Sequence, residues 1–178
     1  ARLNKVAADV VKKLLPVSAG NDLGSLCSWA DRVKIRYRWS SPLHVGFTSD
    51  KGGNTINVTW YNRKAVLHHV WDSSIIETEE KTFCPADVNQ VINNIQLNIT
   101  TIWAKQVKAW ETCPLRQKTC PNIYASESVK AACQWAYKGV RQGSVLQDAY
   151  FRSRLPIVSL RLAQAGVRLA ATLNKIFK

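Results

Sequence analysis

The 178-residue chain contains no methionine and only three histidines, and it has about half as many acidic residues as basic ones. No stretch approaches the roughly 18 consecutive apolar residues that a membrane-spanning helix needs, so we expect no association with a membrane. Because the chain has no methionine and starts at Ala1, we expect a processed chain or an excerpt of a longer product, from which any signal peptide is already absent.

Several signatures of enzyme sites are also missing. No serine lies in a G-x-S-x-G turn, no C-x-x-C pair occurs, and no cysteine is close to a histidine in the sequence. The segment "DKGGN" lacks the spacing of a phosphate-binding P-loop. These absences argue against a serine hydrolase, a thiol enzyme and a P-loop nucleotidase.

The charge balance is strongly positive. Lys and Arg number 25 against 12 for Asp and Glu, which gives a formal net charge of +13. This charge points to polyanionic partners such as nucleic acid, phosphate esters or an acidic surface, although basic surfaces also arise for solubility alone. Seven tryptophans beside this charge would suit base stacking, but we expect most of them in the core.

The cysteines and glycosylation sequons favour a secretory origin. In an oxidising compartment four of the five cysteines could pair and one would be left over. The sequons Asn57-Val58-Thr59 and Asn98-Ile99-Thr100 would place glycans on Asn57 and Asn98. The cysteines are Cys27, Cys84, Cys113, Cys120 and Cys133.

The apolar pattern predicts one mainly α domain with a short β-hairpin near residues 52–61, where Ile56, Val58 and Trp60 alternate after a Gly-Gly turn. The last helix is expected to close the fold on the core, with a membrane-surface or partner-binding role as the alternative. The predicted helices span residues 3–14, 26–39, 63–78, 85–110, 125–139 and 154–178.

The segment "LHHVWD" is the sharpest chemical signal. His68 and Asp72 stand four residues apart, so on a helix their side chains leave the same face and can converge on one metal ion, whereas His69 points about 100° away. A surface hydrogen-bonded pair is the alternative interpretation. Asp31, at the polar edge of a helix face, and His44, after a proline break, are further candidates. Two histidines and two carboxylates suit zinc in an open catalytic site, for which metal-assisted hydrolysis of phosphoesters is the obvious chemistry.

Several separated motifs together resemble one family. The segments "CSWAD", "YRWSSPLH", "PLHVGF", "GGNTI", "LHHVWD", "NIYASES" and "SRLPIV…RLAQAGVRLAATLN" are similar to those of the zinc-dependent, single-strand-preferring nucleases of plants and fungi, with the plant branch much closer. The resemblance covers essentially the whole chain. It implies a mainly α-helical fold shared with bacterial zinc phospholipase C, a cluster of up to three zinc ions, and a secreted or vacuolar monomeric glycoprotein. It also implies endonucleolytic cleavage of RNA and single-stranded DNA to 5′-phosphorylated products, with 3′-nucleotidase activity.

The resemblance carries roles onto individual residues. Asp31 matches a zinc ligand that also orients the attacking water, and Lys34 matches a basic residue that supports catalysis near the phosphate. Arg32, Lys34 and Asn54 are expected to contact the substrate. The zinc ligands implied by the resemblance are Asp31, His44, His68 and Asp72.

The chain departs from the family pattern in two places. It starts downstream of the terminal Trp and the early His of the family, and the disulfide partner of Cys27 would lie in that stretch. The family has two "PLH" segments separated by a long insertion that carries a further His and Asp, whereas here they are fused into one, so that His44 stands for either of two ligands. We therefore expect residues 1–178 to form one nuclease-like domain that lacks the family N-terminus and an internal segment at about 44/45. A non-catalytic nucleic-acid-binding protein and a hydrolase of lipid head groups are the rival functions.

Overall fold

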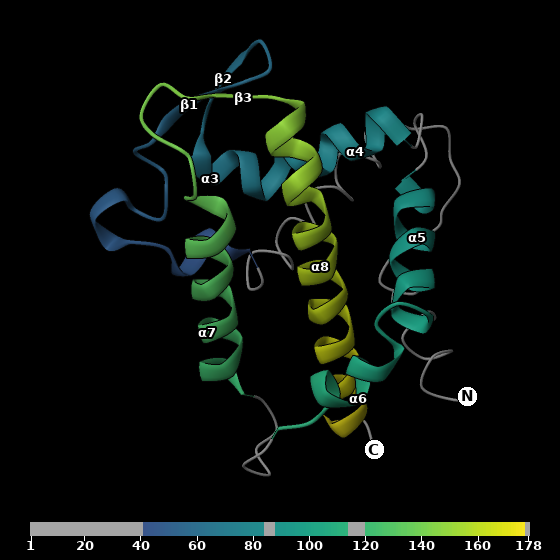
Figure 1. Cartoon of the computed structure of the whole chain (residues 1–178). Coiled ribbons are helices and arrows are strands. Elements are labelled where there is room, and N and C mark those ends of the chain that lie inside the picture. The colour runs from purple at the N-terminus through teal and green to yellow at the C-terminus, as the bar shows by residue number, and fades with distance from the viewer. Residues whose placement is uncertain (1–40, 84–87, 114–119, 177–178) are drawn as a thin grey trace.

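Helices make up most of the molecule. In a computed structural model of the chain, the structure describes residues 41–83, 88–113 and 120–176 (Figure 1). The α-helices are α3 (Leu67–His69), α4 (Ile75–Phe83), α5 (Val88–Thr100), α6 (Ala104–Glu111), α7 (Pro121–Ala131) and α8 (Asp148–Ile176). Shorter turns are the 3-10 helices η1 (Pro42–Val45) and η2 (Thr48–Asp50) and the π-helices η3 (Val70–Ser74) and η4 (Ala132–Ala136). The mainly α prediction is confirmed, while the helices predicted over 3–14 and 26–39 lie outside the described residues.

The small sheet has three strands in the order β2-β1-β3. β1 (Asn57–Trp60) pairs antiparallel with β2 (Arg63–Val66), and β3 (Val145–Leu146) pairs parallel with the other edge of β1. The predicted hairpin is present, but its turn follows Trp60, whereas the Gly-Gly turn precedes β1. The helix predicted from Arg63 begins only at Leu67, because residues 63–66 pair with β1 instead of coiling.

The long helix predicted over residues 85–110 is broken into α5 and α6. The hydroxyls of Thr100 and Thr101 donate hydrogen bonds to the Leu97 carbonyl, at 2.9 and 2.7 Å. The Trp103 amide reaches back five residues to the Asn98 carbonyl, at 2.8 Å. Threonine hydroxyls that bond to the backbone compete with regular helical hydrogen bonding, so the chain turns here and starts a new helix at Ala104.

The core forms where the sheet, α3–η3–α4 and the first half of α8 meet. Trp71 is completely buried there and donates an indole hydrogen bond to the Tyr150 hydroxyl at 2.7 Å, which in turn donates to the Ala136 carbonyl at 2.9 Å. α8 packs against α4, α5 and α6, which confirms the prediction of a closing helix (Figure 1). Of the described tryptophans, Trp60, Trp71 and Trp110 are buried, as expected for core residues.

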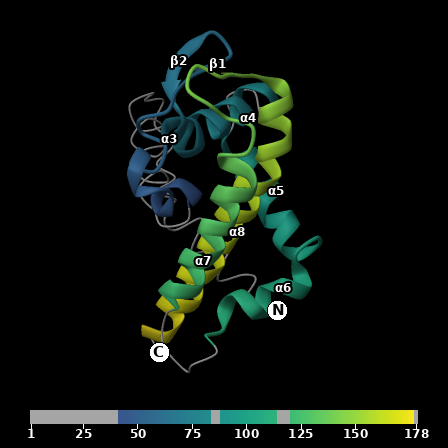
Figure 2. The same ribbon diagram turned by 60° about the vertical axis from the view of Figure 1, so that its left-hand side comes forward.

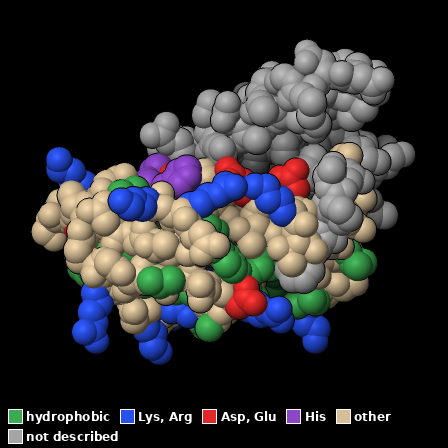
Figure 3. Space-filling view, turned by 90° about the horizontal axis from the view of Figure 1, so that it is seen from above, with side chains coloured by type: hydrophobic (Ala, Val, Ile, Leu, Met, Phe, Trp, Pro, Cys, Tyr) green, Lys and Arg blue, Asp and Glu red, His purple; other side chains and the backbone are tan. Residues whose placement is uncertain are grey.

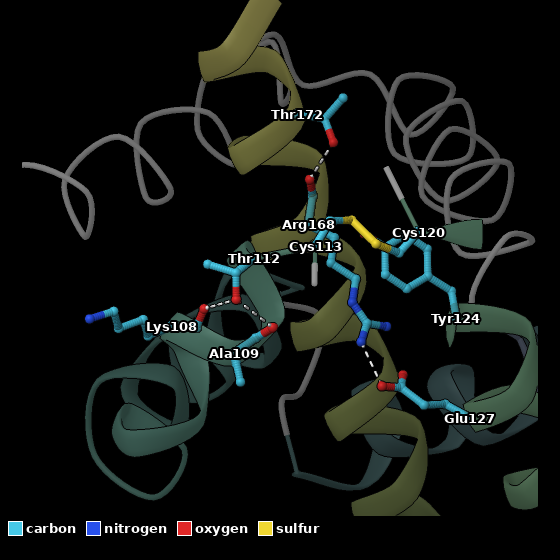
Figure 4. Close-up of a disulfide and its surroundings, with 9 residues drawn as sticks. All are labelled: Lys108, Ala109, Thr112, Cys113, Cys120, Tyr124, Glu127, Arg168 and Thr172. Atoms are coloured by element: carbon cyan, nitrogen blue, oxygen red, sulfur yellow. Dashed lines mark hydrogen bonds and ion pairs between the residues drawn. A yellow bond between two sulfur atoms is a disulfide. The ribbon is translucent and has the colours of Figure 1, made fainter. Parts of the chain in front are cut away.

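Two buried arginines of α8 connect it to α7. Arg161 and Arg168 each place a guanidinium nitrogen 2.8 Å from a carboxylate oxygen of Glu127. Figure 4 shows the Arg168–Glu127 pair, with the Arg168 guanidinium 4.2 Å from the centre of the Tyr124 ring. Burial alone would raise the pKa of Glu127, but hydrogen bonds from both arginines outweigh it and lower the pKa. These charges are therefore part of the packing between α7 and α8, which run alongside each other in Figure 2.

One disulfide is present among the cysteines that the structure describes. Cys113, at the end of α6, bonds to Cys120, which precedes α7 (Figure 4). Cys133 is exposed and free, while Cys27 and Cys84 lie outside the described residues. Within the described ranges, no helix is both long enough and apolar enough to cross a membrane.

Candidate metal centre

His68 and Asp72 lie on one continuous helical run that follows β2. The Nε2 atom of His68 is 3.1 Å from Oδ2 of Asp72. Asp72 lies in the π-helical turn η3, and such turns are frequent at functional sites. Completely buried neighbours, Leu67, Val70 and Trp71, fix this run in the core. The spacing of four residues thus brings the two side chains together, as predicted.

His44 reaches the same carboxylate from a different part of the chain. It lies in η1, which the buried side chains of Pro42 and Leu43 anchor in the core. Its Nε2 atom is 3.1 Å from Oδ2 of Asp72, and its ring centre is 4.7 Å from that of His68. One donor atom from each of His44, His68 and Asp72 therefore lies within 4.8 Å of the others.

A backbone carbonyl orients His68. Nδ1 of His68 is 2.8 Å from the Gly52 carbonyl oxygen, so Nδ1 donates its hydrogen bond there and Nε2 is the ring nitrogen that faces Asp72. Gly52 has φ +66, and a Cβ atom at this position would lie 2.2 Å from the Leu43 carbonyl oxygen. Histidine ligands of metals almost always donate their other N–H group in this way. The Gly-Gly pair predicted a turn, but nothing in the sequence pointed to this role of Gly52.

Asp72 has the electrostatics of a ligand. Burial alone would raise its pKa, but hydrogen bonds from His44 and His68 outweigh this and hold the pKa well below its usual range. The Ser41 hydroxyl contributes to this lowering too, and the Oδ1 atom of Asp72 is buried without a close hydrogen-bond donor among the described residues. An ionised carboxylate with a free buried oxygen beside two imidazoles is a set of donors that a cation would satisfy.

The three donors fit zinc. Zinc binds imidazole nitrogen and carboxylate oxygen at about 2.0–2.2 Å in tetrahedral sites, which places neighbouring donors about 3.4 Å apart. Both histidine–aspartate distances are 3.1 Å, close to this value. Three protein ligands leave a fourth position for water or substrate, as in catalytic zinc sites.

The other predicted site residues are placed as follows. Asn54 is exposed in the turn beside Gly52 and Gly53, where its side-chain amide donates to the Lys51 carbonyl at 2.8 Å. His69 is exposed and takes no part in the cluster, as predicted. Asp31, Arg32 and Lys34 lie outside the described residues.

The cluster of His44, His68 and Asp72 lies at the surface. Figure 3 shows the histidine side chains together on one face, with lysine or arginine side chains beside them. The side chains of His44 and Asp72 are 24% and 20% exposed, so a small anion in solvent can reach the cluster. Nearby positive charge would favour the approach of a phosphate group.

Comparisons with known proteins agree on one family. A sequence model described as "S1/P1 Nuclease" matches residues 40–178. Endonuclease 2 of Arabidopsis thaliana is 45% identical over 248 residues, covering 99% of this chain and 85% of the relative. Endonuclease 4 of the same plant is 39% identical, with 94% and 81% covered, and endonuclease 5 is 50% identical over 136 residues, with 76% and 46% covered.

Proposed function

The chain belongs to the S1/P1 nuclease family, and from this premise we propose that it is a zinc-dependent endonuclease whose metal centre includes His44, His68 and Asp72. The observation that supports this most directly is the meeting of the three side chains around Oδ2 of Asp72. The proposed reaction is hydrolysis of phosphodiester bonds in RNA and single-stranded DNA to 5′-phosphorylated products, with 3′-nucleotidase activity, by a monomeric protein.

The zinc ion, His68 and Asp72 have separate tasks in this proposal. A bound zinc ion would supply Lewis acidity toward phosphoryl oxygens and lower the pKa of water. His68 would turn Nε2 toward the zinc ion, because the Gly52 carbonyl accepts the hydrogen bond from Nδ1. Asp72 remains ionised and contributes the negative charge that retains a divalent cation.

Residues outside the described ranges complete the proposed site. Asp31 would add a carboxylate ligand and orient the attacking water, and Lys34 and Arg32 would neutralise the phosphate charge. Asn54, exposed in the turn that carries Gly52, would contact the substrate. The net charge of +13 supports a polyanionic substrate, because basic proteins attract nucleic acid over long distances.

We also propose that residues 1–178 form one nuclease-like domain from which an internal segment is absent at about 44/45. The alignment with endonuclease 2 runs over 248 residues, at least 70 more than this chain contains, so the relative carries a substantial insertion. The fused "PLH" motif at His44 supports this position for the missing segment. A secreted or vacuolar location, with glycans on Asn57 and Asn98, belongs to the same proposal, and the exposure of Asn57 is compatible with it.

A non-catalytic nucleic-acid-binding protein is the second candidate. The fused motif favours it, because the chain would hold fewer ligands than a cluster of three zinc ions requires. Charge and exposed aromatic side chains would then suffice for binding.

Zinc content and cleavage of single-stranded DNA, measured in the same preparations, test the proposal. The wild-type protein should bind zinc and cleave, whereas His68→Ala and Asp72→Asn should lose both properties. His69→Ala is the matched control, because the His69 imidazole is next to His68 in the sequence but is exposed and lies outside the cluster. This variant should bind zinc and cleave as the wild type does. Wild-type protein without zinc and without cleavage would refute the endonuclease and leave the binding protein.

A further inference from the structure

An exposed aromatic side chain lies three residues after the metal-centre histidine His44. Phe47 is 54% exposed, and its ring packs against that of Tyr137, with centres 5.0 Å apart and planes at 46°. Tyr137 is half-buried and follows the π-helix η4. The Tyr137 ring therefore packs against one side of the Phe47 ring, and about half of the Phe47 side chain stays open to solvent.

The backbone of Phe47 is fixed although its side chain is exposed. Its N–H donates to the Tyr137 hydroxyl at 3.2 Å, and its carbonyl accepts from the Gly52 N–H at 2.8 Å. The Tyr137 hydroxyl donates to Oδ1 of Asp50 at 3.1 Å. Burial and the nearby Asp50 carboxylate raise the pKa of Tyr137 to about 12, so this hydroxyl keeps its proton at neutral pH. An exposed apolar side chain held this firmly loses little conformational freedom when it binds a ligand.

Phe47 and the metal centre share one support. The Gly52 carbonyl accepts a hydrogen bond from Nδ1 of His68, and the Gly52 N–H donates one to the Phe47 carbonyl. Three residues span at most about 11 Å, so the backbone of Phe47 lies no farther than that from the backbone of His44. A strand whose phosphate is at the metal centre would therefore pass close to Phe47.

The charges around Phe47 suit a nucleic acid. Lys51 and Lys138 are exposed and adjoin Asp50 and Tyr137 in the sequence. The nearby Asp50 carboxylate already accepts hydrogen bonds from Tyr137 and from the Gly53 N–H, at 2.8 Å for the latter. Aromatic faces beside lysines are the usual means of binding single strands without sequence preference.

We propose that Phe47, supported by Tyr137, is a stacking platform for a base of the single-stranded substrate, next to the nucleotide at the metal centre. The proposal rests on the proposed nuclease function and names a residue that would position the strand. Stacking requires an unpaired base, so this platform would contribute to a preference for single strands.

The test compares strands with and without bases. The probes are two fluorescein-labelled decadeoxynucleotides, one of thymidines and one with abasic sites throughout, and binding is measured by anisotropy. Phe47→Ala should weaken binding of the thymidine strand by about 5- to 150-fold, the range for loss of one stacked base, with little effect on the abasic strand. Phe47→Tyr should retain wild-type affinity. Ile102→Ala is the matched control, because Ile102 is an exposed apolar residue, 70% exposed, beyond the end of α5.

The possible outcomes separate the interpretations. Unchanged binding by Phe47→Ala, or equal weakening for both strands, would overturn the platform. The platform would also be overturned if the wild type self-associated, Phe47→Ala did not, and both bound the thymidine strand equally well. The Phe47 ring would then bind a second copy of the chain. The platform and the nuclease function can fail separately. If His68→Ala loses zinc but still binds the thymidine strand, the stacking platform stands independently of the metal site. If the wild type bound neither strand, both would be refuted.

Discussion

Replacing Gly52 with alanine should weaken zinc binding about 10- to 100-fold. The size of the effect follows from two observations at this position. With φ +66, a residue that has a side chain adopts the left-handed region at a cost of roughly 1–2 kcal/mol. In addition, the new Cβ atom would lie 2.2 Å from the Leu43 carbonyl oxygen, which is backbone and cannot rotate away.

Relief of the contact between the new Cβ atom and the Leu43 carbonyl must move His44 or the hydrogen-bond partner of His68. The Leu43 carbonyl would have to shift by roughly 1 Å or more to reach ordinary van der Waals distance, and it is bonded directly to His44. If Gly52 moves instead, its carbonyl leaves Nδ1 of His68, now at 2.8 Å. Loss of such an orienting partner typically costs a metal site 10- to 100-fold in affinity.

Gly139→Ala provides the matched control. Gly139 also has a positive φ, +77, but a Cβ atom there would meet no other atom within 4 Å. Gly139→Ala should therefore show only the backbone strain in urea unfolding, about 1–2 kcal/mol, whereas Gly52→Ala should lose at least that much stability and should also lose zinc in competition with a chromophoric chelator. Wild-type zinc affinity in Gly52→Ala, or an equal loss in Gly139→Ala, would refute the role of the carbonyl.

Three further predictions concern stability. Burial raises the pKa of Glu79 to about 7, from 4.5 in the unfolded chain. Above pH 4.5 the unfolded state loses this proton first, so the free energy of unfolding falls as pH rises toward 7. Glu79→Gln should therefore raise the free energy of unfolding at pH 8, by up to about 3 kcal/mol, and leave it unchanged at pH 4. Glu127→Gln should lower the free energy of unfolding at pH 7 by about 2 kcal/mol, since two arginines lose their partner. Because the pKa of Glu127 is lowered from its unfolded value of 4.5, the wild type loses this contribution as pH falls through the folded pKa, so the two proteins should converge in acid. Cys120→Ser should cost about 2.5 kcal/mol in chemical denaturation, because the Cys113–Cys120 bond closes a loop with a separation of seven residues, and reduction of the wild type should match it.

Local patterns predicted the elements that local interactions determine. The apolar spacing predicted helix over most of residues 85–110, although the structure divides this stretch into α5 and α6. The positions of His68 and Asp72 on one helical face required only a period of 3.6 residues. The residues of β2 show no clear alternation, and their strand conformation depends on pairing with β1. The break after Thr100 depends on two hydroxyl hydrogen bonds that no apolar pattern can register.

The candidate site was predictable only in part for the same reason. His44 reaches Asp72 across 28 residues, and the resemblance to a family, rather than any local spacing, suggested that they would meet. The sequence did not predict the role of Gly52, because every residue has a backbone carbonyl and the residue type does not show which one accepts a hydrogen bond from His68. The Phe47–Tyr137 pair joins residues 90 apart, so it too required the folded chain.

The spacing of the three ligands has a consequence for how the family can change in length. His44 and Asp72 are separated by 28 residues, and His68 lies between them. The entropy cost of closing so short a loop is about 1 kcal/mol smaller than for a loop of about 100 residues. The hairpin, the Gly52 turn and the three clustered side chains therefore all lie within one short stretch of the chain. Insertions or losses of chain before His44 therefore leave the loop that joins His44 to Asp72 unchanged in length.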